Sequence, residues 1–293
     1  MKKTVSFTLA IFLFAVSFAQ AHGPNKTTSL ETLVISDIDD TIKLSHILSK
    51  GGAVARAVDS DSWFYGMNYL YQVILENNPN SKIAYLSAAP EVILESTHTK
   101  LLTKANFPKG FYIARTQFVS GKNHKLQAIR SLLNKYKPKK AIFIGDNGER
   151  DSIVYNQITQ EYKKQNIQFY TYIRFVYSKK NQKYAHKLNP IFPGQFLFVT
   201  PIEVAIELHK QKNLTQQTTQ ILTGQMIDSI LEEAIDLRRG VLAFPEFMDC
   251  RGFKWPYTES AEELDSILED NVLRVKMGRL KEKVDYRCSL EMN

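Results

Sequence analysis

The chain has 293 residues, of which 44% are hydrophobic, and its formal net charge at pH 7 is +8. This length and composition are typical of a globular protein with enough chain for one large domain and a full core. The two cysteines form no C-x-x-C pair, no H-E-x-x-H sequence occurs and the basic residues form no arginine cluster, so the common zinc sites are excluded and nucleic-acid binding is not predicted.

The N-terminal segment has the three parts of an export signal. A basic start at Lys2 and Lys3 precedes an apolar stretch at residues 5–18, and residues 19–21 are the small-x-small sequence Ala-Gln-Ala. The apolar stretch is too short for a comfortable membrane span. We therefore expect cleavage before His22 and an exported protein, periplasmic or secreted, whose net charge falls from +8 to +6 with the two lysines.

Beyond the signal, short apolar runs alternate with amphipathic stretches, and residues 42–62, which carry Gly51-Gly52, are expected to form a loop or flap. The predicted strands are residues 33–35, 82–87, 111–113, 140–144, 168–175 and 196–199. The predicted helices are residues 63–77, 90–105, 122–136, 150–165, 202–212 and 218–239. This alternation indicates a parallel sheet with right-handed crossovers. We expect an α/β, Rossmann-like core over residues 22–200, after a signal peptide at 1–21 and before a mainly helical extension at 201–293.

A cluster of acids follows the first predicted strand, in the sequence Asp37-Ile38-Asp39-Asp40-Thr41. Open α/β sheets bind ligands at this end of their strands. Three carboxylates within four residues repel one another unless a cation holds them, and a Mg²⁺ ion carrying a phosphate meets that demand. The alternative is an acidic turn after a strand. Asp37 and Asp39 project to the same side of an extended backbone, so one can attack phosphorus while the other transfers the proton, and Thr41 can bind a phosphate oxygen or fix the turn.

Two further strand ends carry candidate phosphate-binding groups. Ser87 ends the second predicted strand, and its hydroxyl and the backbone around Ala88 face the start of a helix, where phosphate oxygens bind. A serine at this position is also an ordinary helix cap. Lys125, at the start of the third predicted helix, can neutralise phosphate and nucleophile, with Lys122 as the rival candidate and a surface lysine as the alternative.

The fourth predicted strand ends in a glycine-rich acidic sequence, GDNGERD at residues 145–151. Asp146 is placed to bind the metal, while Asp151 can bind it through water or orient the other ligands. By itself this sequence is an ordinary turn. Mg²⁺ in proteins takes one or two carboxylates, waters and the substrate phosphate, which agrees with this set. The predicted metal ligands are therefore Asp37, Asp39, Asp146 and Asp151.

Four strand ends that carry D-x-D-x-T, Ser, Lys and G-D-x-x-x-x-D in this order resemble the haloacid dehalogenase superfamily. The amino-acid sequences of the motifs are more specifically similar to the phosphatidate phosphatase catalytic domain of the yeast actin-patch type, over about residues 33–174. The sequences that carry this resemblance are ISDIDDTI at 35–42, LSAAP at 86–90, HK at 124–125, IGDNGERD at 144–151 and YIR at 172–174.

The resemblance implies a role for each motif residue. Asp37 would be the phosphoaspartyl nucleophile and Asp39 the general acid and base, with Ser87 and Lys125 stabilising the phosphate. Mg²⁺ would be held by Asp37, Asp146 and the backbone carbonyl of Asp39. Enzymes that cleave carbon–halogen bonds lack the second aspartate of the first motif, so this sequence favours a phosphatase or a phosphotransferase.

The spacing between motifs leaves no room for a cap domain over the site. An open site suits a large substrate such as a lipid head group, and Trp63, Phe64 and Tyr65 beside the flap are candidates for peripheral membrane contact. We expect an exported phosphatase of phosphatidate or a related phospholipid. The alternatives are a broad-specificity secreted phosphatase of nucleotides or phosphoproteins, and a non-catalytic module that binds lipid or a partner.

The two cysteines, Cys250 and Cys288, both lie near the C-terminus. In an oxidising compartment two cysteines so placed favour one disulfide. We therefore predict a bond between them.

Overall fold

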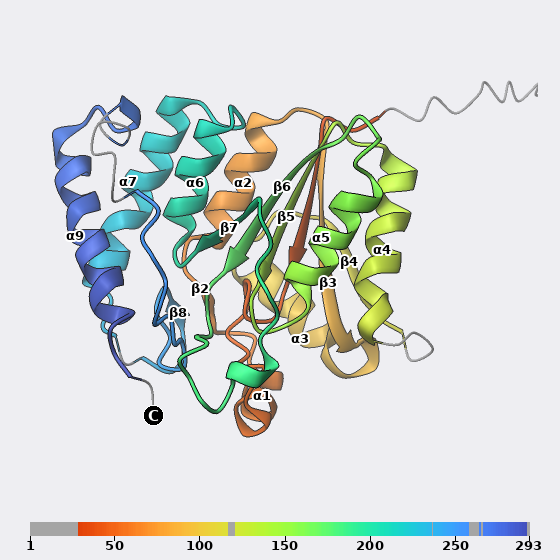
Figure 1. The fold of residues 1–293 in the computed structure, drawn as a ribbon, viewed down its shortest axis with the longest axis horizontal. Helices are drawn as coiled ribbons and strands as arrows, with labels where there is room; N and C mark the ends of the chain where they lie inside the picture. The colour runs from red at the N-terminus through yellow and green to blue at the C-terminus, as the bar shows by residue number, and fades with distance from the viewer. Residues whose placement is uncertain (1–28, 117–120, 236, 258–263, 265, 292–293) are drawn as a thin grey trace, which may run out of the picture.

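A computed structural model describes residues 29–291 apart from 117–120, 236, 258–263 and 265 (Figure 1). The predicted signal peptide at 1–21 lies outside the described residues. Among the residues that are described, no helix combines the length and the apolar character that a membrane span requires.

Six parallel strands form the central sheet, in the order β4-β3-β1-β5-β6-β7, which confirms the α/β, Rossmann-like fold. The strand order reverses beside β1, because the chain runs outward to β4 and then returns to β5. Ligands bind at such switch points, outside the carboxyl ends of the strands. The strands are β1 (Thr32–Asp37), β3 (Ser81–Pro90), β4 (Phe111–Arg115), β5 (Lys140–Asp146), β6 (Gln168–Arg174) and β7 (Gln195–Phe198).

Helices cover both faces of the sheet, and Figure 1 shows them as separate layers. α4 and α5 cover one face, α2 and α6 cover the other, and α7 and α9 form an outer layer beyond α6. Helix α1 lies at the carboxyl-end edge of the sheet, at the bottom of Figure 1. The helices are α1 (Lys50–Ala57), α2 (Met67–Asn77), α3 (Glu91–Lys104), α4 (Gly121–Tyr136), α5 (Asp151–Glu161), α6 (Pro201–Lys210), α7 (Gln216–Glu232) and α9 (Asn271–Arg287), with a short 3-10 turn at Ala185–Lys187.

The central strand β1 is buried along its whole length, as its unbroken apolar run predicts. Leu33 and Ile35 join the apolar cluster beneath α4 and α5, whereas Val34 joins the cluster on the opposite face. Side chains alternate along a strand, so Asp37 points to the same side as Ile35. The nucleophile candidate therefore lies on the α4 side of the sheet.

Two elements differ from the predictions. The predicted flap at residues 42–62 contains α1, and the helix expected from residue 63 begins at Met67, because Trp63–Phe64 forms β2 instead. Strand β2 pairs with β8 (Val241–Leu242), a partner far away in the sequence that local periodicity cannot reveal. Phe64 is fully buried and does not reach the surface, while Trp63 and Tyr65 are partly buried.

The C-terminal extension is mainly helical and packs on the α/β core. Ile206 of α6, Ile227 of α7 and Leu280 of α9 share one apolar cluster with Val34 of β1. The structure joins Cys250 to Cys288 in a disulfide, which confirms the predicted pairing and ties the segment after β8 to the end of α9.

Candidate active site

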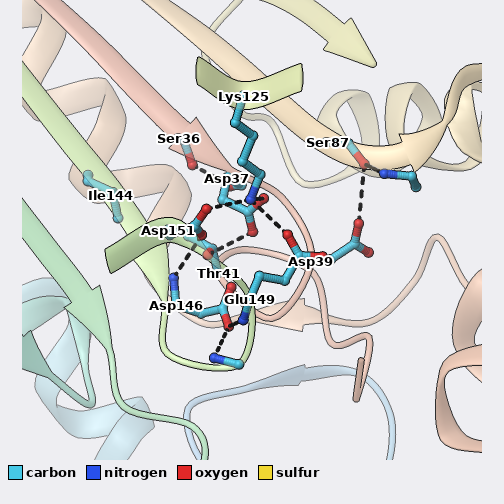
Figure 2. Close-up of polar contacts among 12 residues, drawn as sticks. Ser36, Asp37, Asp39, Thr41, Ser87, Lys125, Ile144, Asp146, Glu149 and Asp151 are labelled. Atoms are coloured by element: carbon cyan, nitrogen blue, oxygen red, sulfur yellow. Dashed lines mark hydrogen bonds and ion pairs between the residues drawn. The ribbon is translucent and has the colours of Figure 1, made fainter. Parts of the chain in front are cut away.

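The carboxyl ends of three neighbouring strands and the first turn of α4 bring the predicted site residues together (Figure 2). Asp37 ends β1, Asp146 ends β5, Ser87 lies near the end of β3 and Lys125 comes from α4. All four side chains are buried. The parallel register places these strand ends side by side, which is why positions so far apart in the sequence meet.

Lys125 is the electrostatic centre of the site. Its ammonium nitrogen lies 2.6 Å from an oxygen of Asp37, 2.5 Å from one of Asp151 and 2.8 Å from one of Glu149. Although burial opposes the charge, these carboxylates raise the pKa of Lys125 well above its ordinary value. Lys125 is therefore a permanent cation next to the nucleophile candidate. The side chain of the rival candidate, Lys122, lies outside the described part of the structure.

Both oxygens of the Asp37 carboxylate are held. Oδ1 accepts a hydrogen bond from Lys125, and Oδ2 accepts one from the Thr41 hydroxyl at 3.0 Å. Burial raises the pKa of Asp37 well above its ordinary value, Lys125 works against that shift, and the carboxylates of Asp151 and Glu149 reinforce it. The site thus carries more negative charge than Lys125 alone neutralises.

Asp39 turns its carboxylate away from Lys125 and toward Ser87 (Figure 2). Its Oδ1 accepts a hydrogen bond from the Ser45 hydroxyl at 2.6 Å, and its Oδ2 accepts one from the Ser87 hydroxyl at 3.3 Å. His98 lies 3.5 Å from Oδ1. Burial raises the pKa of Asp39, but His98, Lys43 and Ser45 outweigh burial and lower it. Because the Asp39 carboxylate faces Ser45, Ser87 and His98, its main-chain carbonyl is the better candidate for a metal ligand.

Asp146 has one satisfied and one orphaned oxygen. Oδ1 accepts hydrogen bonds from the amides of Gly148 at 2.6 Å and Glu149 at 3.1 Å. Oδ2 is buried and has no hydrogen-bond partner among the described residues. Burial raises the pKa of Asp146 well above its ordinary value, and the carboxylates of Asp151 and Asp37 raise it further. A buried carboxylate oxygen without a hydrogen-bond partner is suited to bind a cation.

Asp151 orients its neighbours. One oxygen accepts from Lys125, and the other accepts from the Asp146 amide at 3.2 Å. The side chain also packs against Gly145, where an added Cβ would lie 2.5 Å from an Asp151 oxygen, so only glycine fits there. Both oxygens accept hydrogen bonds. Of the two roles considered for Asp151, which are metal binding through water and orientation of the other ligands, this geometry agrees with orientation.

The residues at hand fit a hard divalent cation. Ligand oxygens of Asp37, Glu149 and Asp151 lie within 4.8 Å of one another, but Lys125 donates a hydrogen bond to each of these residues. The Asp146 oxygen without a partner among the described residues and the carboxylates around it make Asp146 a candidate ligand for such a cation. Oxygen donors of this kind suit Mg²⁺.

The remaining predicted substrate ligands form the opposite wall of the site. The Ser87 hydroxyl accepts a hydrogen bond from the Ala89 amide at 3.1 Å, so its own proton points to Asp39. The Ala88 carbonyl accepts one from the guanidinium of Arg115 at 2.8 Å. Arg115 had no predicted role, and it adds a cation beside the expected phosphate position.

Two further residues, which lie in quoted motifs but had no predicted role of their own, hold the site together. Asp40, whose φ of 57° is left-handed, accepts hydrogen bonds from the amides of Ser45, His46 and Ile47 and from the Tyr177 hydroxyl. It therefore shapes the loop before α1, and no ligand role is needed to explain this third acid of the first motif.

The second is Arg174, which is buried between the rings of Phe64 and Phe198, with its guanidinium carbon 4.1 Å and 4.7 Å from their centroids. It donates a hydrogen bond to the Thr41 carbonyl at 3.1 Å. Arg174 thereby ties the end of β6 to the nucleophile loop.

Comparison with known proteins gives one family match. Residues 32–174 match the family model described as "Phosphatidate phosphatase APP1, catalytic domain". The phosphatidate phosphatase APP1 of Saccharomyces cerevisiae is 30% identical over 148 residues, which are 47% of this chain and 25% of the yeast protein. The aligned region thus spans about a quarter of the length of that relative.

Among solved structures, the HAD domain of effector protein Lem4 from Legionella pneumophila is 18% identical, with a TM-score of 0.34 over 48% of this chain and 86% of that chain. A chain of the Pnkp1/Rnl/Hen1 RNA repair complex is 13% identical, with a TM-score of 0.27 over 57% of this chain and 43% of that chain. The family match covers all four motifs of the site. Residues 32–174 therefore match the catalytic-domain family of the phosphatidate phosphatase APP1.

Proposed function

We propose that this protein is an exported, Mg²⁺-dependent phosphatase that hydrolyses phosphatidate or a related phospholipid through a phosphoaspartyl intermediate. The observation that carries the proposal is the double anchoring of Asp37 by Lys125 and Thr41 at the end of the central strand. This arrangement holds a carboxyl oxygen of Asp37 in place next to a cation, as nucleophilic attack on a phosphate requires. The family match supports the phosphatase chemistry and the class of substrate.

In the first step an oxygen of Asp37 attacks phosphorus, the bond from phosphorus to the leaving oxygen breaks, and the proton of Asp39 passes to that oxygen. Lys125 and the Ser87 hydroxyl bind the equatorial phosphate oxygens, where negative charge is spread. Mg²⁺, when bound by Asp37 and Asp146, supplies further positive charge against the transferring group.

In the second step Asp39, now ionised, removes a proton from water, and the hydroxide oxygen attacks the phosphoaspartyl phosphorus. Inorganic phosphate leaves and Asp37 is regenerated. In the free protein the pKa of Asp39 is lowered. An incoming phosphate dianion acts in the opposite direction, because a second negative charge nearby favours the protonated form. Substrate binding thus favours protonation of Asp39, and the first step uses this proton.

The rim of the site supports a substrate at a membrane surface. Helix α1 begins at Lys50 and exposes Val54, and the C-cap residue Val58 is exposed as well; their accessible fractions are 76% and 81%. Lys187 donates a hydrogen bond to the Leu48 carbonyl, so a further lysine lies at the same edge. Exposed aliphatic side chains next to lysines suit peripheral contact with an anionic lipid surface.

The test compares the release of phosphate from phosphatidate in mixed micelles with that from a soluble phosphate monoester, in Mg²⁺ and in excess chelator. Asp37→Asn is the matched control, because the amide keeps the volume but cannot attack phosphorus. We expect Mg²⁺-dependent turnover that favours the lipid and is absent in this variant. The lipid preference should weaken as salt rises, since attraction beyond a Debye length of about 8 Å is screened at physiological ionic strength. Equal or better turnover of the soluble ester at both low and high salt would contradict the preference for lipid and would favour a broad-specificity phosphatase.

A further inference from the structure

His98 is a buried histidine that no catalytic motif contains, yet it faces the acid of the first motif. It lies on α3 and is fully buried. Its Nδ1 is 3.1 Å from the Tyr112 hydroxyl, and its Nε2 is 3.5 Å from Oδ1 of Asp39. Nε2 has no hydrogen-bond partner among the described residues. A buried polar atom left without a hydrogen bond is uncommon and calls for a reason.

We propose that His98 is a positioning residue that holds the Asp39 carboxylate in place for proton transfer. The inference rests on the proposed phosphatase function and adds to it a residue from outside the four motifs. His98 does not touch the substrate in this proposal and acts only through Asp39.

The two oxygens of Asp39 have different surroundings, and these define different tasks. Oδ1 is bound by the Ser45 hydroxyl at 2.6 Å and faces His98, both of which belong to the protein scaffold. Among the described residues, Oδ2 is bound only by the hydroxyl of Ser87, at 3.3 Å. When a phosphate takes the Ser87 hydroxyl, Oδ2 is released. Oδ2 is then the oxygen that transfers the proton, and Oδ1 is the anchored one.

The Tyr112 hydroxyl can determine which ring nitrogen of His98 carries the proton, and the anchoring of Asp39 requires that proton on Nε2. If its hydroxyl donates to Nδ1, the single proton of a neutral imidazole resides on Nε2, which then points its N–H at Oδ1 of Asp39. A partner on one ring nitrogen commonly sets the tautomer at the other in this way. Catalytic hydrogen bonds are often long in the free protein and shorten in the substrate complex, so we expect the 3.5 Å separation to close when substrate binds.

The consequence is chemical, because Asp39 protonates the leaving oxygen as its bond to phosphorus breaks. A poor leaving group, such as the phenolate of phenyl phosphate, depends strongly on that proton. A good leaving group, such as 2,4-dinitrophenolate, departs without it. Loss of the His98 contact should therefore impair the first ester selectively, whereas general damage to the fold would impair both esters equally.

The experiment measures kcat and KM of the wild type and of His98→Ala and His98→Gln on phenyl phosphate and 2,4-dinitrophenyl phosphate in Mg²⁺. We expect His98→Ala to lower kcat/KM on phenyl phosphate by about 10–100-fold, as misplacing a proton-transfer group by about an ångström does, and to leave kcat/KM on the dinitrophenyl ester nearly unaffected, because kcat/KM reports the first step and the second step is the same for both esters. His98→Gln should recover most of the loss, because its amide can donate to Oδ1. His209→Ala is the matched control, because this histidine on α6 contacts the Leu214 carbonyl away from the site, and it should leave both rates unchanged.

Equal losses on both esters, or no loss on either, would overturn the inference and leave the proposed function intact. If His98→Ala does not fold, the positioning role of His98 is tested with His98→Gln and Tyr112→Phe instead. Tyr112→Phe removes the group that directs the Nε2 proton and should show a smaller loss with the same selectivity for phenyl phosphate. A wild type inactive on both esters and on phosphatidate would refute the proposed function itself, an outcome distinct from any result with the His98 variants.

Discussion

Replacing Asp146 by Asn should stabilise the protein in chelator and abolish its response to Mg²⁺. In the metal-free protein, Oδ2 of Asp146 is buried with no partner among the described residues, and burial and the carboxylates of Asp151 and Asp37 raise its pKa well above the ordinary value. The substitution removes this charge. It keeps an oxygen that can still accept from the amides of Gly148 and Glu149.

The expected magnitude follows from the cost of an unsatisfied buried group. That cost is about 1–3 kcal/mol, and more for a charged group. For a protein of this size, 1 kcal/mol corresponds to roughly 2–4 °C in the unfolding midpoint. We therefore expect Asp146→Asn to melt about 2–12 °C above the wild type in chelator, if the new amide finds acceptors among the nearby carboxylates.

The pH dependence has a definite sign. A carboxyl group whose pKa is raised on folding stabilises the folded state below its unfolded pKa, and that contribution is lost as the pH rises through the folded pKa. The wild type should therefore lose stability from Asp146 as the pH increases, while the variant should not. The difference in melting temperature should be small near pH 5 and larger near pH 8.

The assay is thermal unfolding followed by circular dichroism, in chelator and in Mg²⁺. A ligand at 100 times its dissociation constant stabilises the folded state by about 2.7 kcal/mol, so the wild type should gain several degrees and Asp146→Asn should not. Asp285→Asn, which removes an exposed acid paired with Lys281, is the control and should behave as the wild type. A variant that melts below the wild type in chelator, or that still gains from Mg²⁺, would refute the assignment of Asp146.

Three further substitutions test other parts of the structure. Lys125→Met should abolish turnover and, by leaving three carboxylates without their cation, destabilise the protein by about 3–5 kcal/mol in urea unfolding; unchanged stability would show that the cluster needs no cation. Asp39→Asn should lower kcat/KM roughly 10²–10⁴-fold, most strongly for poor leaving groups, and a uniform loss of kcat/KM over a series of esters would contradict proton transfer from Asp39 to the leaving oxygen. Cys288→Ala opens the loop closed with Cys250 and should cost about 3–4 kcal/mol of unfolding free energy under oxidising conditions, a loss that reducing agent should reproduce in the wild type.

The acids of the first motif show which site residues can be placed from the sequence alone. Asp37 could be placed at a strand end because the apolar run before it has the length and side-chain composition of a buried strand. Ser87 and Asp146 follow the same logic, since parallel strands bring their carboxyl ends to one edge, whereas Lys125 was predicted at the start of a helix. The wording of the motifs then indicated the family that residues 32–174 match.

Glu149 and His98 show where the sequence analysis stops. Glu149 lies inside a quoted motif, yet only the fold turns its carboxylate to Lys125, 24 positions away. His98 is one of 14 residues in a helix without a motif, and its approach to Asp39 depends on how α3 packs. No local pattern encodes such contacts, because helix periodicity shows which face is buried and not which side chain that face meets.

By itself the sequence determined the alternation of the core strands and helices, the acidic and polar residues at the strand ends and the pair of cysteines, because each is carried by neighbouring residues or by a count. The tertiary structure decided the β2–β8 pairing, the two hydrogen-bonded oxygens of Asp39 and the orphaned oxygen of Asp146. These features arise from groups far apart in the sequence that share a low-dielectric interior. There, the cost of an unpaired charge depends on every neighbour within a few ångströms, and only the folded chain specifies those neighbours.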